Sequence, residues 1–404
     1  MISVEEALTR ILDHFTALPS ETVALSEAFG RVLAKDITAR VTQPPHAVSA
    51  MDGYAVRAED VAAVPADLRV IGRVPAGGLF DGRVGAGEAV RIFTGAPLPE
   101  GADAIVIQED TEASDSQVTV KESSPVGHYV RPAGLDFAEG DSGPVAGRLL
   151  TARDIGLIAA MNHPWVQVHR RPRVAILATG DEVVMPGDPL GPSQILSSNG
   201  PALAAFVRAC GGEPIQLGIA PDRSEQLGAL AAGARGADLL LTAGGASVGE
   251  HDLVQSTLER QGLELDFWKI AMRPGKPLMF GRLGETPMLG LPGNPVSALV
   301  CALLFARPAL NRMRGLNGPA HPLTPMILGA DLPANDRRQD YLRARVSLDA
   351  GGRKTATPYG RQDSSMLAML AAADGLILRP PHAEAAQKGT AVSVLELRDL
   401  AAGL

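Results

Sequence analysis

The chain has 404 residues, 46% of them hydrophobic, and a formal net charge of −8. This charge excludes broad binding to nucleic acid, because neutralising the phosphates requires a basic face. The length predicts roughly two to four domains, each large enough to bury a core.

The N-terminal sequence MISVEEALTRILDHF predicts an amphipathic helix with acids at Glu5 and Glu6, unlike a secretory signal. No apolar run reaches the roughly 18 residues that a membrane span needs. Both cysteines, Cys210 and Cys301, lie in apolar, helix-like runs, which is typical of core thiols in a reducing compartment. No Cys/His cluster has the spacing of zinc ligands. We therefore predict a cytoplasmic protein with neither a membrane nor nucleic acid as partner.

Residues 1–40 alternate helix-like stretches with a short strand at Thr22–Leu25, and residues 141–171 predict a helix followed by a strand. We assign these two segments together to an elongated linking domain. Between them, residues 41–140 contain short runs such as LRVIGRV and DAIVIQED, separated by glycine and proline. Such runs are typical of a small β-rich domain, here inserted into the linking domain.

Residues 172–318 alternate buried-type strands with helices, a pattern that predicts a mostly parallel sheet covered on both faces. One of these helices is preceded by Asp222, which has the spacing of a capping box with Glu225. Residues 319–404 return to strands and predict a C-terminal domain resembling a β-barrel. The expected fold is therefore multidomain α/β plus β, with a central α/β domain flanked by two β domains and a linking domain.

Four predicted strands of the α/β domain end in polar or glycine-rich loops, at Thr179–Glu182, at Asp222, at Gly244–Asp252 and at Leu291–Pro295. Because parallel strands align, these loops should share one edge of the sheet, where ligands bind in open α/β folds. Glycine-rich turns that lead into helices expose backbone N–H groups and the positive end of the helix dipole. This edge therefore suits an anion such as a phosphate.

Charged side chains of both signs are expected at this edge. The segment FWKIAMRPGKP supplies Lys269, Arg273 and Lys276, either as anion-binding cations or as a solvated basic loop. Its prolines and glycine fix the backbone in an extended arrangement, which favours binding. Asp222 alone is explained as a helix N-cap and Asp252 as a first-turn acid. Carboxylates gathered beside bound phosphates would instead need a divalent cation, for which Mg²⁺ is the expected choice.

Other nucleotide and hydrolase motifs are absent or incomplete. The chain contains neither GxGxxG nor GxxxxGK[ST], which excludes the dinucleotide-binding and P-loop classes. Gly245–Gly249 matches the GxSxG motif of serine hydrolases. No convincing Asp-then-His pair follows it, because His321 and His382 fall in the next domain. Ser247 is therefore expected to offer a hydroxyl or a backbone N–H to an anion.

Six motifs occur in order along nearly the whole chain: SAMDGYAVRAED, FTGAPLPEGADAIVIQED, LATGDEV, LLTAGGASVGEHD, MRPGKP and LGLPGNPVSALV. Together they resemble the molybdopterin molybdenumtransferase family, which includes the C-terminal domain of gephyrin. The resemblance implies the last step of molybdenum-cofactor synthesis, in which adenylylated molybdopterin is hydrolysed with Mg²⁺, AMP leaves, and molybdate enters the dithiolene. It also implies a homodimer whose active cleft lies between the α/β domain of one subunit and the β domains of the other.

The resemblance implies roles for individual residues. The catalytic residues, three on the β-rich domain and three at the α/β edge, would be Asp52, Thr94, Asp136, Glu182, Asp222 and Asp252. The ligands of Mg²⁺ among them would be Asp52, Glu182 and Asp252. The substrate-binding residues expected from the loops, the cations and the resemblance together are Lys269, Arg273, Lys276, Ser247, Gly244, Gly245, Pro292, Asn294, Arg343 and Ser364.

Two positions depart from the family. His46-Ala47-Val48 stands where the family commonly has Phe-Asp-Asn, so a titratable histidine is present and one acid is missing. Arg273 stands where lysine is also usual, and a planar fork replaces a point charge. The remaining acids would bind Mg²⁺ and help molybdate to lose oxygens as water, with a carboxylic acid of raised pKa delivering protons.

Two other functions stay open at this point. One is a gephyrin-like scaffold that uses the fold without turnover. The other is the related molybdopterin adenylyltransferase, which shares the α/β domain but does not need the flanking β domains. For the transferase itself, the expected partners are adenylylated molybdopterin, molybdate, a molybdopterin adenylyltransferase and the molybdoenzymes that receive the cofactor.

Overall fold

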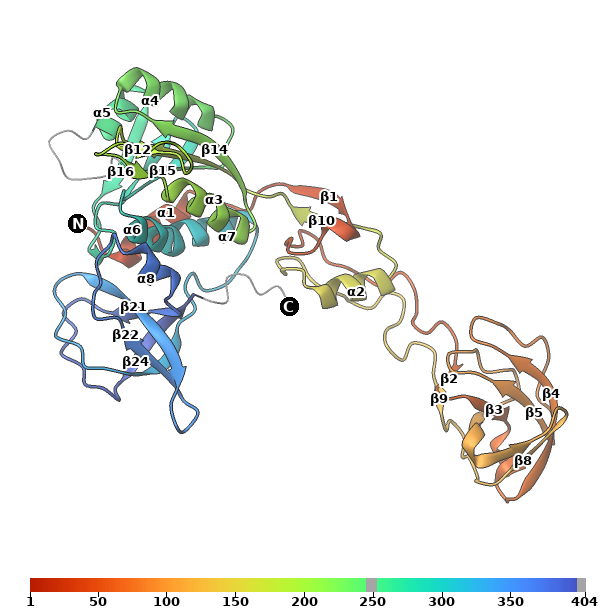
Figure 1. Ribbon diagram of the computed structural model, residues 1–404. Coiled ribbons are helices and arrows are strands. Elements are labelled where there is room, and N and C mark those ends of the chain that lie inside the picture. Colours follow the sequence, from red (N-terminus) through yellow and green to blue (C-terminus); the bar gives the residue numbers. More distant parts are fainter. Residues whose placement is uncertain (245–252, 398–404) are drawn as a thin grey trace.

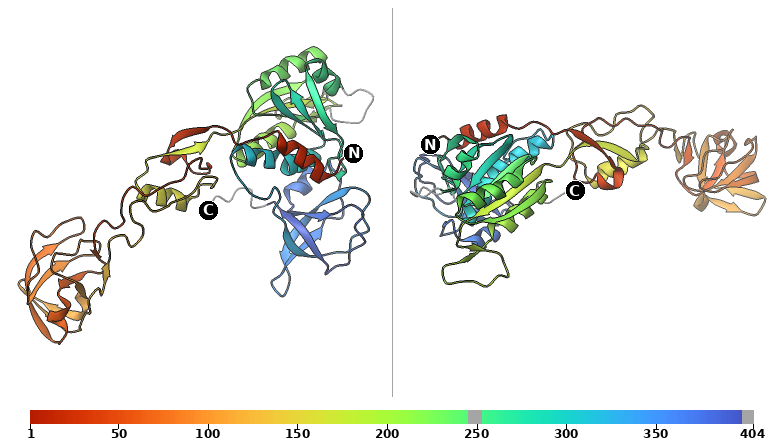
Figure 2. Two further views of the ribbon diagram at one scale, coloured as in Figure 1. Left: turned by 180° about the vertical axis from the view of Figure 1, so that it is seen from behind. Right: turned by 90° about the horizontal axis from the view of Figure 1, so that it is seen from above.

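A computed structural model describes residues 1–244 and 253–397, and Figure 1 shows that the molecule is elongated. The β-rich domain forms one end, the α/β and C-terminal domains form the other, and a slender linking region joins them. Figure 2 shows the same separation from behind and from above. The multidomain α/β plus β fold predicted from the sequence is confirmed.

The linking region combines two segments that are far apart in the sequence. Strand β1 (Ser20–Ala24) pairs antiparallel with β10 (Trp165–His169). Helix α2 (Ala152–Ala160) begins at a capping box in which Thr151 and Asp154 bond each other. Apolar side chains of the two strands and the helix form one buried cluster. This cluster holds together the chain segments that lead into and out of the β-rich domain.

The β-rich domain contains a six-stranded sheet in the order β6-β3-β5-β4-β8-β7. Its strands are β3 (Gly53–Val56), β4 (Ala66–Val74), β5 (Glu88–Ile92), β6 (Ala104–Ile107), β7 (Thr111–Ala113) and β8 (Gln117–Val120). Because side chains alternate along each strand, the sheet buries a separate apolar cluster on each face. A two-stranded ribbon, β2 (Val48–Ser49) with β9 (Val130–Arg131), joins the segments that enter and leave the domain.

The α/β domain contains a six-stranded sheet in the order β14-β11-β15-β19-β18-β16. Its strands are β11 (Arg173–Thr179), β14 (Glu213–Ala220), β15 (Leu239–Ala243), β16 (Leu263–Trp268), β18 (Met279–Leu283) and β19 (Thr286–Leu291). Strands β14, β11, β15 and β19 run parallel, and β18 is antiparallel to both of its neighbours. The carboxyl ends of the four parallel strands therefore meet at one edge, as predicted.

Helices cover both faces of this sheet. The helices of the domain are α3 (Asn199–Ala209), α4 (Ser224–Ala231), α5 (Leu253–Arg260), α6 (Pro295–Cys301) and α7 (Arg307–Met313), with a π-helical turn between the last two. Side chains of α3, α6 and α7 belong to the apolar cluster on one face, and Leu227 and Leu258 belong to the other. The first helix of the chain, α1 (Val4–Asp13), also packs into the first cluster.

Among residues 1–244 and 253–397, one stretch of helix is long and, on average, apolar enough to cross a membrane, although Arg307 and Arg312 interrupt its apolar run. It runs from Pro295 to Met313 with a mean hydropathy of 1.3, and 83% of it is buried inside the protein. This burial identifies it as the core helix of the α/β domain.

The C-terminal domain is a closed sheet built from β20 (Thr324–Leu328), β21 (Gln339–Leu348), β22 (Lys354–Pro358), β23 (Gly375–Arg379) and β24 (Ala391–Glu396). The ring closes because β21 pairs with both β22 and β23, which confirms the predicted barrel-like domain. Strand β17 (Met272–Arg273), from the loop that carries the predicted cations, adds to β21. Helix α8 (Leu367–Ala371) lies between β22 and β23 in the sequence.

The predicted capping box at Asp222 is wrong. Helix α4 begins at Ser224, its N-cap is Arg223, and no side chain caps it. The backbone N–H of Asp222 donates to Oδ1 of Asp181 over 3.0 Å. The carboxylate of Asp222 therefore belongs to the loop that follows β14, one position too early to cap the helix.

Candidate active site

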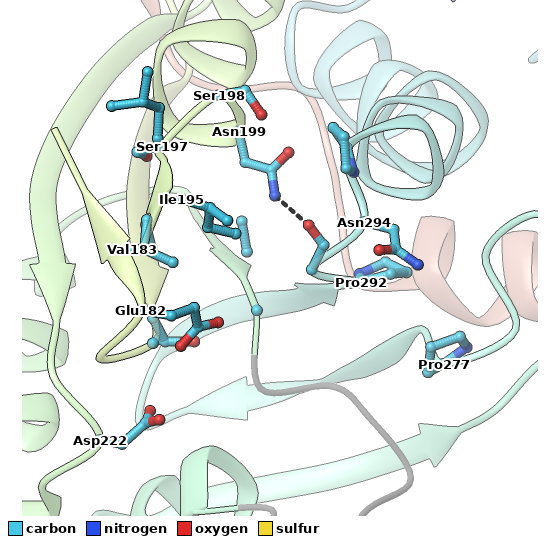
Figure 3. Close-up of a pocket in the computed structure, with 18 residues that line it drawn as sticks. Glu182, Val183, Ile195, Ser197, Ser198, Asn199, Asp222, Pro277, Pro292 and Asn294 are labelled. Carbon is cyan, nitrogen blue, oxygen red and sulfur yellow. Dashed lines mark hydrogen bonds between the residues drawn. The ribbon is translucent and has the colours of Figure 1, made fainter. Parts of the chain in front are cut away.

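The carboxyl edge of the α/β sheet opens into a cavity of about 660 Å³. Loops that follow the parallel strands line it through residues such as Asp222, Gly244 and Pro292. A small flap, β12 (Val183–Val184) paired with β13 (Ile195–Leu196), forms a further wall. Figure 3 shows the side chains that surround this cavity. It lies at the edge where the sequence predicted an anion.

Carboxylates gather at one end of the cavity. Glu182, just after β11, and Asp222, just after β14, both line it, and Figure 3 shows them near one another. Asp181 adjoins them through its hydrogen bond with the backbone of Asp222. Burial raises the pKa of the Asp222 carboxyl, and the negative charges of Asp181 and Glu182 raise it further. Asp222 therefore keeps a proton more readily than an ordinary aspartate.

Neutral polar groups at the starts of two helices line the opposite end. Nδ2 of Asn199, on α3, donates to the carbonyl of Gly293 over 2.7 Å (Figure 3). Nδ2 of Asn294, the N-cap of α6, donates to Oγ of Ser364 over 2.9 Å, which brings a predicted residue of the C-terminal domain to the rim. Oδ1 of Asn199 is buried without a partner in the described part of the chain. The amide donors of both asparagines are thus engaged within the protein, and the backbone N–H groups at the starts of α3 and α6 are the donors that this end offers to an anionic ligand.

Gly244 shapes the wall between these two ends. Its backbone is left-handed, with φ of +109°, and a Cβ there would lie 2.6 Å from the carbonyl oxygen of Thr179. Gly244→Ala should therefore destabilise the fold by about 1–3 kcal/mol. Gly293→Ala is the matched control, because its Cβ would meet the Cα of Gly244 at an ordinary 3.7 Å. Urea unfolding compares the two variants, and equal stability would show that position 244 tolerates a side chain.

The predicted cationic segment borders the cavity at Pro277. Arg273 is engaged in an ion pair with Asp340 of the C-terminal domain. Nζ of Lys269 instead lies 3.7 Å from the centroid of the Trp268 ring. The segment contains the short strand β17 and no helix, in agreement with the predicted effect of its prolines. Of the three predicted cations, Arg273 is therefore paired with a carboxylate and Lys269 lies beside an aromatic ring.

On the β-rich domain, Asp52 is held by Thr94. Thr94 donates both its N–H and its hydroxyl to Oδ1 of Asp52, each over 2.8 Å. These two hydrogen bonds, with a smaller contribution from the positive charge of Arg91, hold the pKa of Asp52 below its ordinary value. The guanidinium of Arg91 lies over the rings of Tyr54 and Phe93. Asp52 is therefore a positioned carboxylate that stays ionised at neutral pH.

Asp136 lines a second cavity, of about 540 Å³, on the same domain. His46 lines it as well, together with Arg131. Gly95, the neighbour of Thr94, connects this cavity with the loop that holds Asp52. The three predicted residues of the β-rich domain therefore share one region of its surface.

The remaining predicted residues lie elsewhere. Arg343 is only 2% exposed, and its Nε donates to the side chain of Gln362 within the C-terminal barrel. Its contact with a substrate stays a prediction. Gly245, Ser247 and Asp252 fall outside the described residues.

The two groups of acids are far apart within one chain. Asp52 immediately precedes β3 at one end of the molecule, whereas Glu182 and Asp222 follow β11 and β14 at the other (Figure 1). Among residues 1–244 and 253–397, no three His, Cys, Asp or Glu side chains lie close enough together to hold a metal ion. A site that uses both groups therefore cannot form within a single chain of this shape.

Two polar residues of the site were missed from the sequence. Asp181 directly precedes Glu182 in the same strand-end loop, and Asn199 is the first residue of α3. The signal for both was available. Each follows a predicted strand end or opens a predicted helix at the edge where the ligand was expected.

Three family models match the chain in order. The MoeA N-terminal region (domain I and II) matches residues 2–162, a probable molybdopterin binding domain matches residues 175–312, and the MoeA C-terminal region (domain IV) matches residues 325–397. Fold, cavity and matches together define a protein of the molybdenum-cofactor biosynthesis class.

Full-length relatives identify the family. Molybdopterin molybdenumtransferase 2 of Mycobacterium tuberculosis is 37% identical over 98% of this chain and 100% of its own length. Molybdopterin molybdenumtransferase of Nostoc sp. is 36% identical over 94% of this chain and 89% of its own length. The crystal structure of the molybdopterin biosynthesis MoeA protein from Pyrococcus horikoshii matches with a TM-score of 0.83 and 33% identity over 98% of this chain and 99% of that one. The chain belongs to the molybdopterin molybdenumtransferase (MoeA) family of transferases.

Proposed function

We propose that this protein hydrolyses adenylylated molybdopterin and inserts molybdate into its dithiolene, releasing AMP and molybdenum cofactor. The observation that carries the proposal is the cavity at the carboxyl edge, whose acidic end contains Glu182 and Asp222. Its other end presents the N-termini of α3 and α6 to an anion. Such a division suits a substrate that carries phosphates and reacts through loss of oxygen atoms as water.

The working molecule in this proposal is a homodimer. Asp52 and Asp136 lie at the opposite end of the chain from Glu182 and Asp222 (Figure 1). A second copy related by a two-fold axis can bring its β-rich domain to the cavity of the first, and symmetry then completes two equivalent sites.

Magnesium fits the acidic end of this cavity. Mg²⁺ usually takes one or two carboxylates together with phosphate oxygens. Glu182 lines this end with a carboxylate, which is the type of donor that Mg²⁺ takes. Glu182 and, from the second copy, Asp52 would hold the ion, and Asp252 is the third predicted ligand. When bound, the ion would neutralise charge on the phosphoanhydride as that bond breaks.

The acids of the two groups take different roles because their pKa values are shifted in opposite directions. Asp52 is held ionised by Thr94, whereas burial and neighbouring charges favour a proton on Asp222. When two carboxyl groups have pKa values shifted apart by their environments, the one with the higher pKa commonly acts as the general acid. The one with the lower pKa stays ionised and stabilises positive charge. We assign Asp222 to proton delivery to the departing molybdate oxygens, and Asp52 to stabilising positive charge.

A reducing, cytoplasmic location belongs to the same proposal. Cys210 and Cys301 are both buried free thiols, which is usual for proteins kept in a reducing compartment. The adenylyltransferase that makes the substrate and the molybdoenzymes that accept the product are the expected partners there.

The direct test combines purified protein, adenylylated molybdopterin, molybdate and Mg²⁺. We expect AMP release in step with active cofactor, which is measured by reconstituting a molybdoenzyme apoprotein. Reactions without molybdate control for hydrolysis alone. Binding of the substrate without AMP release would contradict the proposal and favour a scaffold. Synthesis of adenylylated molybdopterin from ATP would instead identify an adenylyltransferase.

A further inference from the structure

Lys269 and Trp268 form a cation–aromatic pair at the carboxyl edge of the α/β sheet. Nζ of Lys269 lies 3.7 Å from the centroid of the Trp268 ring. Trp268 ends β16, where it pairs with Met279 of β18. The backbone N–H of Lys269 donates to the carbonyl of Leu278, whose neighbour Pro277 lines the cavity. The pair therefore belongs to the loop that borders the candidate active site.

The charge of Lys269 is held differently from that of Arg273. Arg273 pairs with Asp340 and Asp336 of the C-terminal domain, whereas Lys269 has no ion pair in the part of the chain that the structure describes. A carboxylate neutralises a cation and takes up its N–H donors. An aromatic face attracts the ammonium group but leaves its charge and its donors available. Lys269 is therefore prepared for an incoming anion, and Arg273 holds two domains together.

The pair carries two local costs. The Nε1–H of Trp268 is buried and has no acceptor among the described residues, and such unpaired donors are rare because each one forfeits its hydrogen bond to water. The backbone of Lys269 is left-handed, with φ of +73°, a conformation uncommon outside glycine. Unfavourable features at adjacent residues are typical of functional sites. Phenylalanine at position 268 would avoid the first cost.

We propose that Trp268 is a positioning residue that holds Lys269 ready for the phosphate-bearing part of the substrate. This inference rests on the proposed function and names the residue that prepares one of its binding groups. Trp binds cations more strongly than Phe or Tyr. This stronger binding to Lys269 explains why position 268 has a tryptophan although its Nε1–H lacks an acceptor among the described residues. Because the contact acts on binding, it should influence KM and leave kcat nearly unchanged.

Substitutions at Trp268 separate positioning from packing. Trp268→Leu should raise the KM for adenylylated molybdopterin between about 2-fold and 30-fold, the range that corresponds to cation–π energies. Trp268→Phe should raise KM by less, while its urea unfolding midpoint stays equal to or above that of the wild type. A Trp268→Phe protein that is less stable but has an unchanged KM would overturn the proposal, because the indole would then serve packing alone.

A double substitution tests whether Trp268 acts through Lys269. The KM of Trp268→Leu/Lys269→Met should equal that of Lys269→Met, because the ring has no cation left to hold. If Trp268→Leu raises KM as much in the Lys269→Met background as in the wild type, the ring acts by another route and the inference is wrong.

Fluorescence tests the contact without any turnover. The chain has two tryptophans, and Trp165 lies in the linking region with 60% of its surface exposed. In a Trp165→Phe background, Lys269→Met should change the emission of Trp268, and an unchanged emission would refute the pair. If the emission changes but the wild-type protein releases no AMP, the contact stands and the proposed function fails.

Discussion

Asp222→Asn is expected to lower kcat for molybdenum insertion by about 10²–10⁴-fold, the usual contribution of a general acid. Burial and the charges of Asp181 and Glu182 raise the pKa of Asp222, so it can carry a proton where an ordinary aspartate has lost one. Asparagine preserves the shape but has no such proton to give. In the wild type, kcat should fall as the pH rises above the raised pKa, and the variant should lack this decline.

The same substitution should stabilise the fold at neutral pH. When the folded-state pKa of a carboxyl is raised, the folded state loses stability as the pH rises from the ordinary value of 3.8 through the raised one, and the loss persists above it. Asparagine carries no charge and escapes this loss. Urea unfolding at pH 7 should therefore place Asp222→Asn at or above the wild type.

Asp188→Asn is the matched control for both measurements. Asp188 is an exposed aspartate in the segment between β12 and β13 and does not line the cavity. Its substitution should leave both kcat and stability unchanged. If Asp222→Asn retains full kcat, Asp222 is not the proton donor, whatever its effect on stability.

The gathering of Glu182 and Asp222 could be predicted from the sequence, because parallel strands bring their carboxyl ends to one edge. The same argument placed Gly244 and Pro292 beside them, and the structure places all four around one cavity. Local capping could not be predicted as well. The spacing to Glu225 predicted Asp222 as the N-cap of α4, but the helix begins one residue later and its N-cap is Arg223.

Contacts between segments far apart in the chain could not be predicted from the sequence. The ion pair of Arg273 with Asp340 joins residues of two domains, and the bond from Thr94 to Asp52 spans 42 positions. Both contacts change the chemistry of a predicted residue. The ion pair with Asp340 neutralises Arg273, which the sequence presented as a free cation. The hydrogen bonds from Thr94 lower the pKa of Asp52, and the sequence offered no information on that pKa.

If each active site is shared by two chains, two inactive variants should restore activity when they are mixed. Asp52→Asn and Glu182→Gln should each be nearly inactive alone, since every site of either homodimer lacks one essential carboxylate. When the two proteins are mixed under conditions that exchange subunits, half of the dimers should contain one chain of each kind. In such a dimer, one site carries both changes and the other carries neither.

A control pair isolates this geometry. Thr94→Val and Asp52→Asn both alter the β-rich domain, in residues that bond each other. Mixing these two proteins should restore nothing, because every site would then receive one altered β-rich domain. Restoration in this control would indicate that exchange produces activity by some other route.

The AMP released by the mixture of Asp52→Asn and Glu182→Gln tests most directly whether the two chains share each active site. The shared-site arrangement predicts recovery to about a quarter of the wild-type rate, from half of the dimers with one intact site in each. A mixture that stays as inactive as its components, although exchange has been verified, would show that Asp52 and Glu182 do not meet across two chains.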